Sequence, residues 1–198
     1  MFHINFAVLF LLFIELPPTV SPSQGELVDV KKLVPDVVLD LRYATENNFT
    51  HHRVYDRAVC LARRSTAEKL AAVQKELQTE GLGLKLFDCY RPLSVQKKFW
   101  SLVPDERYVA NPARGSRHNR GAALDLTLIR VADGKQLDMG TEFDDFTERA
   151  HRDYASLPPN VRTNRKKLED VMARHGFIGL PTEWWHFDDR DWERYAVT

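Results

Sequence analysis

The sequence of 198 residues has no net charge, because 28 basic side chains balance 28 acidic ones. A balanced chain has no overall field to attract nucleic acid or an anionic membrane, so the composition argues against both as partners. Internal repeats, low-complexity tracts and linker-like stretches are also missing. These absences, at a length usual for one folding unit, predict a single domain with a core large enough to fold without additional staples.

Long hydrophobic runs are absent except near the start of the chain. Residues 6–14 (FAVLFLLFI) are apolar, but nine residues are too few to cross a hydrocarbon core of about 30 Å as a helix. Pro17, Pro18 and a Ser/Pro-rich stretch follow, an order typical of a secretory signal. No Lys or Arg precedes the run, so a buried N-terminal strand is the alternative. We expect residues 1–23 to be a signal segment that exports residues 24–198 to the periplasm.

Cysteine is nearly absent as well. Only Cys60 and Cys89 occur, and no C-x-x-C pair is available to bind a metal. An exported protein can join two cysteines in a disulfide, because oxidising compartments allow it. Two buried free thiols also fit the sequence, so both states remain open at this point.

The chain does contain strand-like and helix-like segments in loose alternation. This arrangement predicts an α+β fold with a mainly antiparallel central sheet flanked by helices, rather than a doubly wound sheet. Ser65 and Glu68 form a capping box before a helix that we expect to end at Gly81. Further helices are expected from Pro92 through Trp100 and over residues 163–175, and strands within residues 37–43, 82–88, 122–129 and 183–187.

A carboxylate interrupts the strand expected at residues 122–129. Leucines alternate along one face of this strand, while Asp125 falls on the other face. Burying a lone carboxylate costs several kcal/mol unless it is paired or binds a metal. Gly121 lets the chain bend just before the strand, so His118 can fold back beside Asp125. The stretch therefore indicates a polar site at the sheet.

A second imidazole comes from the stretch EWWHFD, in which Glu183 precedes His186 by three residues. Two histidines and one aspartate supply three nitrogen and oxygen ligands for tetrahedral zinc and leave one position open, as in catalytic sites. Residues three apart on a regular strand point to opposite faces, so Glu183 and His186 share a site only near a bend or strand end. There Glu183 can act as a general base toward a metal-activated water.

Each of these residues also has a simpler interpretation. His118 alone is more often a satisfied polar residue, and Asp125 alone can cap a turn or pair with an arginine. Glu183 and His186 can belong to an aromatic cluster with the two tryptophans between them. The zinc-protease helix motif H-E-x-x-H is absent. Spacing alone therefore leaves the metal site open.

Two motifs together resemble a known family. The pattern S-x-H-x-x-G-x-A-x-D at residues 116–125, combined with E-W-W-H at residues 183–186, is similar to the D-alanyl-D-alanine dipeptidases. These are zinc enzymes of vancomycin resistance and cell-wall recycling, related to D,D-carboxypeptidases and to the zinc domain of hedgehog proteins. Further similar blocks occur in the same order, so the resemblance covers nearly all of residues 26–190; they are residues 27–49, 87–92 and 137–146.

The resemblance implies roles for individual residues. His118, Asp125 and His186 match the zinc ligands of the family, and Glu183 matches its general base. Arg91 matches an arginine that stabilises the tetrahedral oxyanion, a role suited to a permanently charged guanidinium. The alternative for Arg91 is a structural ion pair with nearby Asp88.

Substrate contacts are implied as well. Asp144 resembles the acid that binds the ammonium group of the substrate, with Ser116 and Tyr43 as secondary contacts. Asp138 and Asp145 lie close enough in the sequence to be alternatives for this acid.

The function implied by the resemblance is the zinc-dependent hydrolysis of D-alanyl-D-alanine to free D-alanine, in cell-wall peptide turnover or scavenging. We expect one zinc ion per chain and a small dipeptide as the partner. One alternative is a D,D-carboxypeptidase or endopeptidase acting on peptidoglycan stem peptides. The other is a non-catalytic binding module stabilised by zinc.

Overall fold

The computed structural model describes residues 21–198. The expected signal segment therefore lies outside the described residues, except for positions 21–23. Within the described part of the chain, no helix combines the length and the apolar character needed to cross a membrane.

A mixed sheet of five strands forms the centre of the fold, in the order β2-β4-β5-β7-β6. Only the β2–β4 pair is parallel, and the other neighbours are antiparallel. The prediction of an α+β fold with a mainly antiparallel sheet is confirmed. The strands are β2 (Val38–Leu39), β4 (Leu82–Asp88), β5 (Ala123–Arg130), β6 (Phe177–Gly179) and β7 (His186–Asp189), and a separate antiparallel pair joins β1 (Leu27–Asp29) to β3 (Leu61–Arg63).

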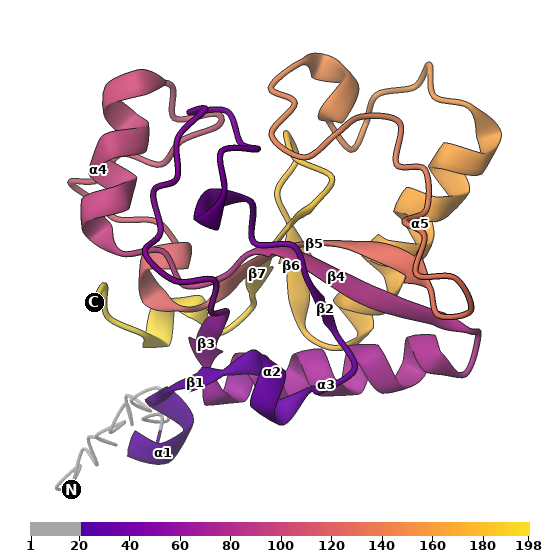
Figure 1. Ribbon diagram of the computed structural model, residues 1–198, viewed down its shortest axis with the longest axis horizontal. Helices are drawn as coiled ribbons and strands as arrows, with labels where there is room; N and C mark the ends of the chain where they lie inside the picture. Colours follow the sequence, from indigo (N-terminus) through magenta and orange to yellow (C-terminus); the bar gives the residue numbers. More distant parts are fainter. Residues whose placement is uncertain (1–20) are drawn as a thin grey trace, which may run out of the picture.

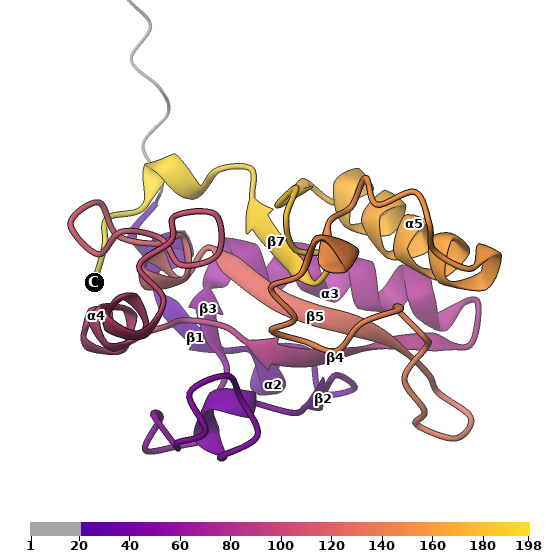
Figure 2. The ribbon, with the colours of Figure 1, turned by 90° about the horizontal axis from the view of Figure 1, so that it is seen from above.

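α3 (Arg64–Gln78) lies along one side of this sheet, whereas α4 (Leu93–Leu102) and long loops lie on the other (Figure 1). α3 packs against β4 and against α5 (Pro159–Arg174), which also contacts β6. Figure 2 shows α3 and α5 side by side along the strands. The remaining helical segments are α1 (Pro22–Gly25) and α2 (Val30–Leu33), with short 3-10 helices η1 (Arg42–Ala44), η2 (His118–Arg120), η3 (Glu148–Ala150) and η4 (Trp192–Arg194).

The strongly patterned segments form the elements that the sequence predicts. β4 has the expected bounds, β5 is displaced by one residue, and α4 begins directly after Pro92. The expected cap at Ser65 is wrong: the residue before α3 is Arg63, and the Ser65 hydroxyl instead bonds the hydroxyl of Tyr195. The helix also ends at Gln78, three residues before Gly81.

Other boundaries differ because local turns compete with the expected pattern. The strand predicted within residues 37–43 is reduced to two residues, and α5 begins at Pro159, where proline is preorganised for the first helical turn. The last strand starts at His186 rather than Glu183, because the Glu183 amide bonds Leu180 and the Trp184 amide bonds Ala150. Glu183 therefore lies in a turn before the strand.

Candidate active site

The candidate site is built on a row of residues across three adjacent strands. Asp88 at the end of β4 pairs with Asp125 in β5, and Asp125 pairs with His186 at the start of β7. Residues directly opposite each other in neighbouring strands share a face, with Cβ atoms about 4.5–5.5 Å apart. The register of β4 shifts between Leu86 and Asp88, so Asp88 rather than Phe87 lies opposite Asp125. An irregularity in the sheet thus brings the three polar side chains together.

His118 reaches the same place from η2, just before β5. Its side chain is buried, and its Nδ1 lies 2.7 Å from the carbonyl oxygen of Cys89. The 3-10 turn is closed by Gly121 at φ 69°, where a side chain would be strained and would collide with Leu27. The glycine in the sequence motif therefore lets the turn fold His118 back beside the strand, as expected.

The donor atoms of His118, Asp125 and His186 converge at metal-ligand separations. His118 Nε2 lies 3.1 Å from His186 Nδ1, which lies 3.0 Å from Asp125 Oδ1, and Oδ1 lies 3.4 Å from His118 Nε2. Ligands about 2.0–2.1 Å from a tetrahedral zinc ion would be roughly 3.3 Å from one another. Among the described residues, this trio is the group of donor side chains close enough to hold a metal ion.

The outer nitrogens of the two imidazoles are already bonded, which fixes what the inner nitrogens can do. His118 Nδ1–H donates to the Cys89 carbonyl, which can only accept, and His186 Nε2–H donates to Asp188 Oδ1 at 2.9 Å. In the neutral form of each ring, the inner nitrogen is then a lone pair that faces the Asp125 carboxylate. Three acceptors that face one another require a cation, so these residues fit a metal ion with imidazole and carboxylate ligands.

The electrostatics of the cluster also favour positive charge. Burial disfavours the charged form of His186, yet Asp188 and Asp125 outweigh it and raise the pKa of His186 to about 10. Burial raises the pKa of Asp125, but the two imidazoles, His118 foremost, hold it well below its ordinary value. The chain therefore supplies a place for a positive charge, which a proton or a metal ion can fill.

Glu183 stands beside the donor cluster without belonging to it. Its Oε2 lies 3.8 Å from His186 Nδ1, and the side chain is buried. Because Glu183 precedes β7 in a turn, the opposite-face problem of a regular strand does not arise. Burial, above all, raises the pKa of this carboxyl to about 8. A carboxyl with a pKa near neutrality is suited to accept and return a proton.

The Arg91 guanidinium is held rigidly near the same point. Asp88 Oδ2 accepts hydrogen bonds from Nε at 3.0 Å and Nη2 at 2.7 Å, and Gln96 Oε1 accepts one from Nη1 at 2.9 Å. The ion pair with Asp88, considered above as an alternative, is therefore present. A guanidinium has five N–H groups, so two remain for a ligand. Arg91 also lines the cavity described below, and the ion pair therefore orients the group that faces it.

Asp144 has one bonded and one free oxygen. The Tyr43 hydroxyl donates to Asp144 Oδ1 at 3.0 Å, whereas Oδ2 is buried with no hydrogen-bond partner. Burial, with Asp125 nearby, raises the pKa of Asp144 to about 8. A buried carboxylate oxygen without a donor is costly, so the geometry calls for a cationic or N–H donor at this position.

Asp138 and Asp145, the alternatives to Asp144, instead bond to their own loop. Their carboxylates accept the backbone N–H groups of Gly140 at 2.8 Å and Thr147 at 2.9 Å. Ser116, the other predicted contact, is buried and accepts the amide N–H of His118. Of the three acids, Asp144 is the one that faces the cavity.

These side chains surround a cavity of about 80 Å³. The cavity thus suits a small substrate. All eight residues predicted for the site line it: Tyr43, Arg91, Ser116, His118, Asp125, Asp144, Glu183 and His186.

Residues 23–197 match a protein family described as D-Ala-D-Ala dipeptidase. The chain belongs to this family. It is 41% identical to the D-alanyl-D-alanine dipeptidase of Escherichia coli strain K12, with 82% of this chain and 84% of that protein covered. The enzyme of the same name from Enterococcus faecium is 34% identical, with 81% and 89% covered. Among solved structures, VanYB in complex with D-alanine-D-alanine is similar at 15% identity and a TM-score of 0.45, with 68% of this chain and 74% of that chain covered.

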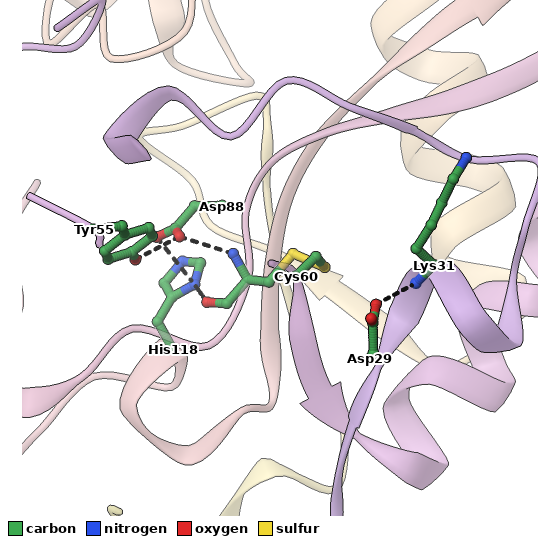
Figure 3. The surroundings of a disulfide bond; sticks show 7 residues. Asp29, Lys31, Tyr55, Cys60, Asp88 and His118 are labelled. Atoms are coloured by element: carbon green, nitrogen blue, oxygen red, sulfur yellow. Dashed lines mark hydrogen bonds and ion pairs between the residues drawn. A yellow bond between two sulfur atoms is a disulfide. The ribbon is translucent and has the colours of Figure 1, made fainter. Parts of the chain in front are cut away.

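A disulfide supports the metal-binding side of this dipeptidase-family site. Cys60 and Cys89 are joined, which decides between the two states left open by the sequence. Figure 3 shows the bond beside His118, Asp88 and Tyr55. Cys89 offers its carbonyl to His118, and its N–H donates to Asp88 Oδ1 at 2.8 Å, the oxygen that also accepts from the Tyr55 hydroxyl. Cys89, which bonds both His118 and the carboxylate that holds Arg91, is thus covalently tied to Cys60.

The sequence reasoning missed two carboxylates with clear geometric tasks. Asp188 orients His186, and Asp88 orients Arg91. The signal for Asp188 was available, because His186 and Asp188 are two apart in a strand and must share a face. Asp88 was noted only as an alternative partner, since its position opposite Asp125 depends on the shift in register.

Proposed function

We propose that the chain hydrolyses the dipeptide D-alanyl-D-alanine to two molecules of D-alanine, with one zinc ion held by His118, Asp125 and His186. The relatives that bear this enzyme's name, each covered over more than four-fifths of its length, support the substrate. The observation that carries the proposal is the convergence of three donor side chains on a small cavity that also contains Glu183 and the free oxygen of Asp144.

Zinc is the proposed ion because two imidazoles and one carboxylate are a usual ligand set of catalytic zinc. When bound, the ion would polarise the scissile carbonyl and lower the pKa of the attacking water. Glu183 takes one proton from this water as its oxygen bonds the carbonyl carbon. When the C–N bond breaks, Glu183 returns the proton to the leaving amine. One buried carboxyl thus acts first as base and then as acid.

Arg91 acts on the carbonyl oxygen. Its two spare N–H groups donate to this oxygen as negative charge develops, while Asp88 and Gln96 keep the guanidinium in place. Because the donors are fixed beforehand, no reorganisation accompanies the reaction; such donors are typically worth about 2.7–4 kcal/mol.

Asp144 selects for a free amino terminus. The substrate's ammonium group donates to Oδ2, which otherwise has no partner. An N-acylated peptide would leave this oxygen desolvated and unpaired, at a cost of about 1–3 kcal/mol.

The alternatives fit the structure less well. A carboxypeptidase acting on stem peptides has no free ammonium group next to the scissile bond, so it would leave Asp144 Oδ2 without a partner. A non-catalytic module has no need of a buried glutamate beside the donor cluster or of an arginine with donors to spare. The dipeptidase function therefore gives Glu183, Arg91 and Asp144 each a role, whereas neither alternative requires all three.

Release of D-alanine from D-alanyl-D-alanine, with and without chelator, tests the proposal. We expect turnover that stops on zinc removal and returns when zinc is added, and little turnover of N-acetyl-D-alanyl-D-alanine. Glu183→Gln should keep about one zinc per chain yet lose at least about a hundredfold in turnover, at the lower end of what a general base contributes. His118→Ala should lose the ion. Equal turnover of the free and blocked peptides would refute the pocket, and full zinc occupancy in His118→Ala would refute the ligand set.

We also propose that the mature domain acts in the periplasm, on dipeptide released during wall turnover. The disulfide supports this location, because such bonds persist in oxidising compartments. Cell fractionation of a tagged full-length chain tests it. Recovery of the tag with cytoplasmic markers would contradict export.

A further inference from the structure

Two arginines remain outside the mechanism, Arg165, which is buried, and Arg152, which is partly buried, and each bonds backbone carbonyls of a segment that carries a site residue. Arg165 in α5 is 7% exposed, and its three guanidinium nitrogens all donate to carbonyl oxygens. Nε bonds Met139 at 2.7 Å, Nη1 bonds His151 at 3.0 Å and Nη2 bonds Arg149 at 3.0 Å. A single rigid fork therefore joins both ends of residues 139–151 to one helix.

The segment held by Arg165 has little regular structure of its own. Between Met139 and His151, its helical content is the short η3 turn. Asp144 lies in the middle of this segment at φ 63°, a conformation that non-glycine residues rarely adopt. Such a backbone persists only where its surroundings fix it. Arg165 supplies that constraint on both sides of Asp144.

Arg152 does the same for residues 180–186. Its Nε donates to the Leu180 carbonyl at 2.9 Å, and its Nη2 donates to the carbonyls of Trp184 at 3.1 Å and His186 at 2.9 Å. Its own backbone N–H bonds the carbonyl of Pro181 at 2.9 Å. These contacts lie before and after Glu183, which itself lies in a turn.

Gly179 gives independent evidence that the Arg152 guanidinium is closely fitted. A side-chain carbon at Gly179 would collide with the Cζ, Nε and Nη2 atoms of Arg152. The φ angle of this glycine is not positive, so the backbone conformation does not demand a glycine there. A glycine is needed there because any side chain would occupy the space of the guanidinium.

We propose that Arg165 and Arg152 are positioning residues with separate tasks: Arg165 fixes Asp144 for the substrate's ammonium group, and Arg152 fixes Glu183 and His186 for proton transfer and metal binding. The two tasks rest on the proposed function, whereas the holding of the two segments does not. The proposal predicts different kinetic signatures for two chemically identical substitutions.

The test compares Arg165→Lys and Arg152→Lys in the zinc-loaded full chain. Lysine keeps the charge but lacks the planar fork, so it reaches fewer carbonyls. Arg165→Lys should raise KM for D-alanyl-D-alanine about tenfold, with kcat and zinc affinity within about twofold of the starting protein. Arg152→Lys should lower kcat and zinc affinity about tenfold and leave KM within about twofold. Arg162→Lys, exposed on the same helix as Arg165, is the matched control and should change none of these values.

Two further measurements keep the proposal testable apart from turnover. Gly179→Ala displaces the Arg152 guanidinium without removing charge, and it should reproduce the Arg152→Lys loss of zinc affinity. Amide hydrogen exchange should accelerate in residues 139–151 of Arg165→Lys alone, and in residues 180–186 of Arg152→Lys alone. If the starting protein does not hydrolyse the dipeptide, the proposed function fails, while exchange and zinc affinity still decide the holding roles.

The proposal is overturned if both lysine variants lower only the melting temperature and leave the kinetic constants, zinc affinity and local exchange unchanged. It is equally overturned if the two signatures are exchanged or are the same for both variants.

Discussion

Asp144 is an unfavourable group that the fold retains at the proposed ammonium site. One oxygen is bonded by Tyr43, and the other is buried without a partner. The resulting pKa of about 8 means that the free protein favours the neutral carboxyl at pH 7, whereas an ammonium group favours the charged one. The residue therefore costs stability until substrate arrives.

Asp144→Asn should stabilise the metal-free protein at neutral pH. The pKa of Asp144 rises from an ordinary 3.8 to about 8 on folding, so the folded form keeps a proton that the unfolded chain releases between these values. Stability contributed by the neutral carboxyl is thus fully present below the lower pKa and lost as pH rises toward the upper one. Asparagine does not titrate, so its advantage should be small near pH 4 and largest at pH 8. Thermal unfolding across this range measures it, and a pH-independent difference would contradict the assignment.

Asp188 offers a second prediction at this scale. Its carboxylate holds His186 through Nε2, and removal of such a partner typically weakens metal binding by about 10–100-fold. Asp188→Ala should show that loss in competition with a chelator. Asp191→Ala, which removes an exposed partner of Lys69, is the control. Equal zinc affinity in the two variants would show that Asp188 does not orient the imidazole.

Among elements, the patterned ones follow from the sequence and the irregular ones do not. β4 and β5 alternate strictly, so their bounds and the face of Asp125 could be predicted. β2 and β6 have two and three residues, too few to show a period, and they form only because a neighbouring strand accepts them. The turn that carries Glu183 depends on contacts with residue 150, which no local pattern encodes.

Substitution of Gly121 and of Gly134 can distinguish the cost of backbone strain from the role of a turn in positioning the site. Both have positive φ, at 69° and 68°, but a side chain at Gly121 would collide with Leu27, whereas none of the surroundings crowd Gly134. Alanine at either position should lower the free energy of unfolding by about 1–2 kcal/mol. Only Gly121→Ala should also weaken zinc binding, because its turn carries His118. Denaturant unfolding measures the change in stability, and chelator competition measures zinc affinity. Equal zinc affinity in the two variants would show that the turn at Gly121 does not position His118.

In the molecule as a whole, the site lies where segments distant in sequence meet. The meeting of the motif residues at one site could be predicted because family resemblance supplied what spacing alone left open. The disulfide, the contacts of Arg152 and Arg165, and the size of the cavity could not be predicted, because each depends on packing between elements. Cys60 and Cys89 are 29 residues apart, and either state fitted the composition.

Removal of the disulfide should destabilise the whole molecule. A closed loop of this length restricts the unfolded chain by about 3–4 kcal/mol in the chain-entropy estimate. The double variant Cys60→Ala, Cys89→Ala should lose about this free energy of unfolding in denaturant. The unaltered protein should resist thiol alkylation until it is reduced after unfolding, because both cysteines are buried. Labelling of the unfolded, unreduced protein would contradict the bond.

The same pairing of cysteines has a chemical consequence for the catalytic centre. The sequence has two cysteines, both joined to each other, and the proposed ligands are nitrogen and oxygen atoms. Peroxide attacks thiolates and stepwise converts them to sulfenic and sulfinic acids, which eject the metal from sulfur-ligated sites. A centre without sulfur presents no such target, so this hydrolase should keep its ion under oxidative attack that would empty a thiolate site.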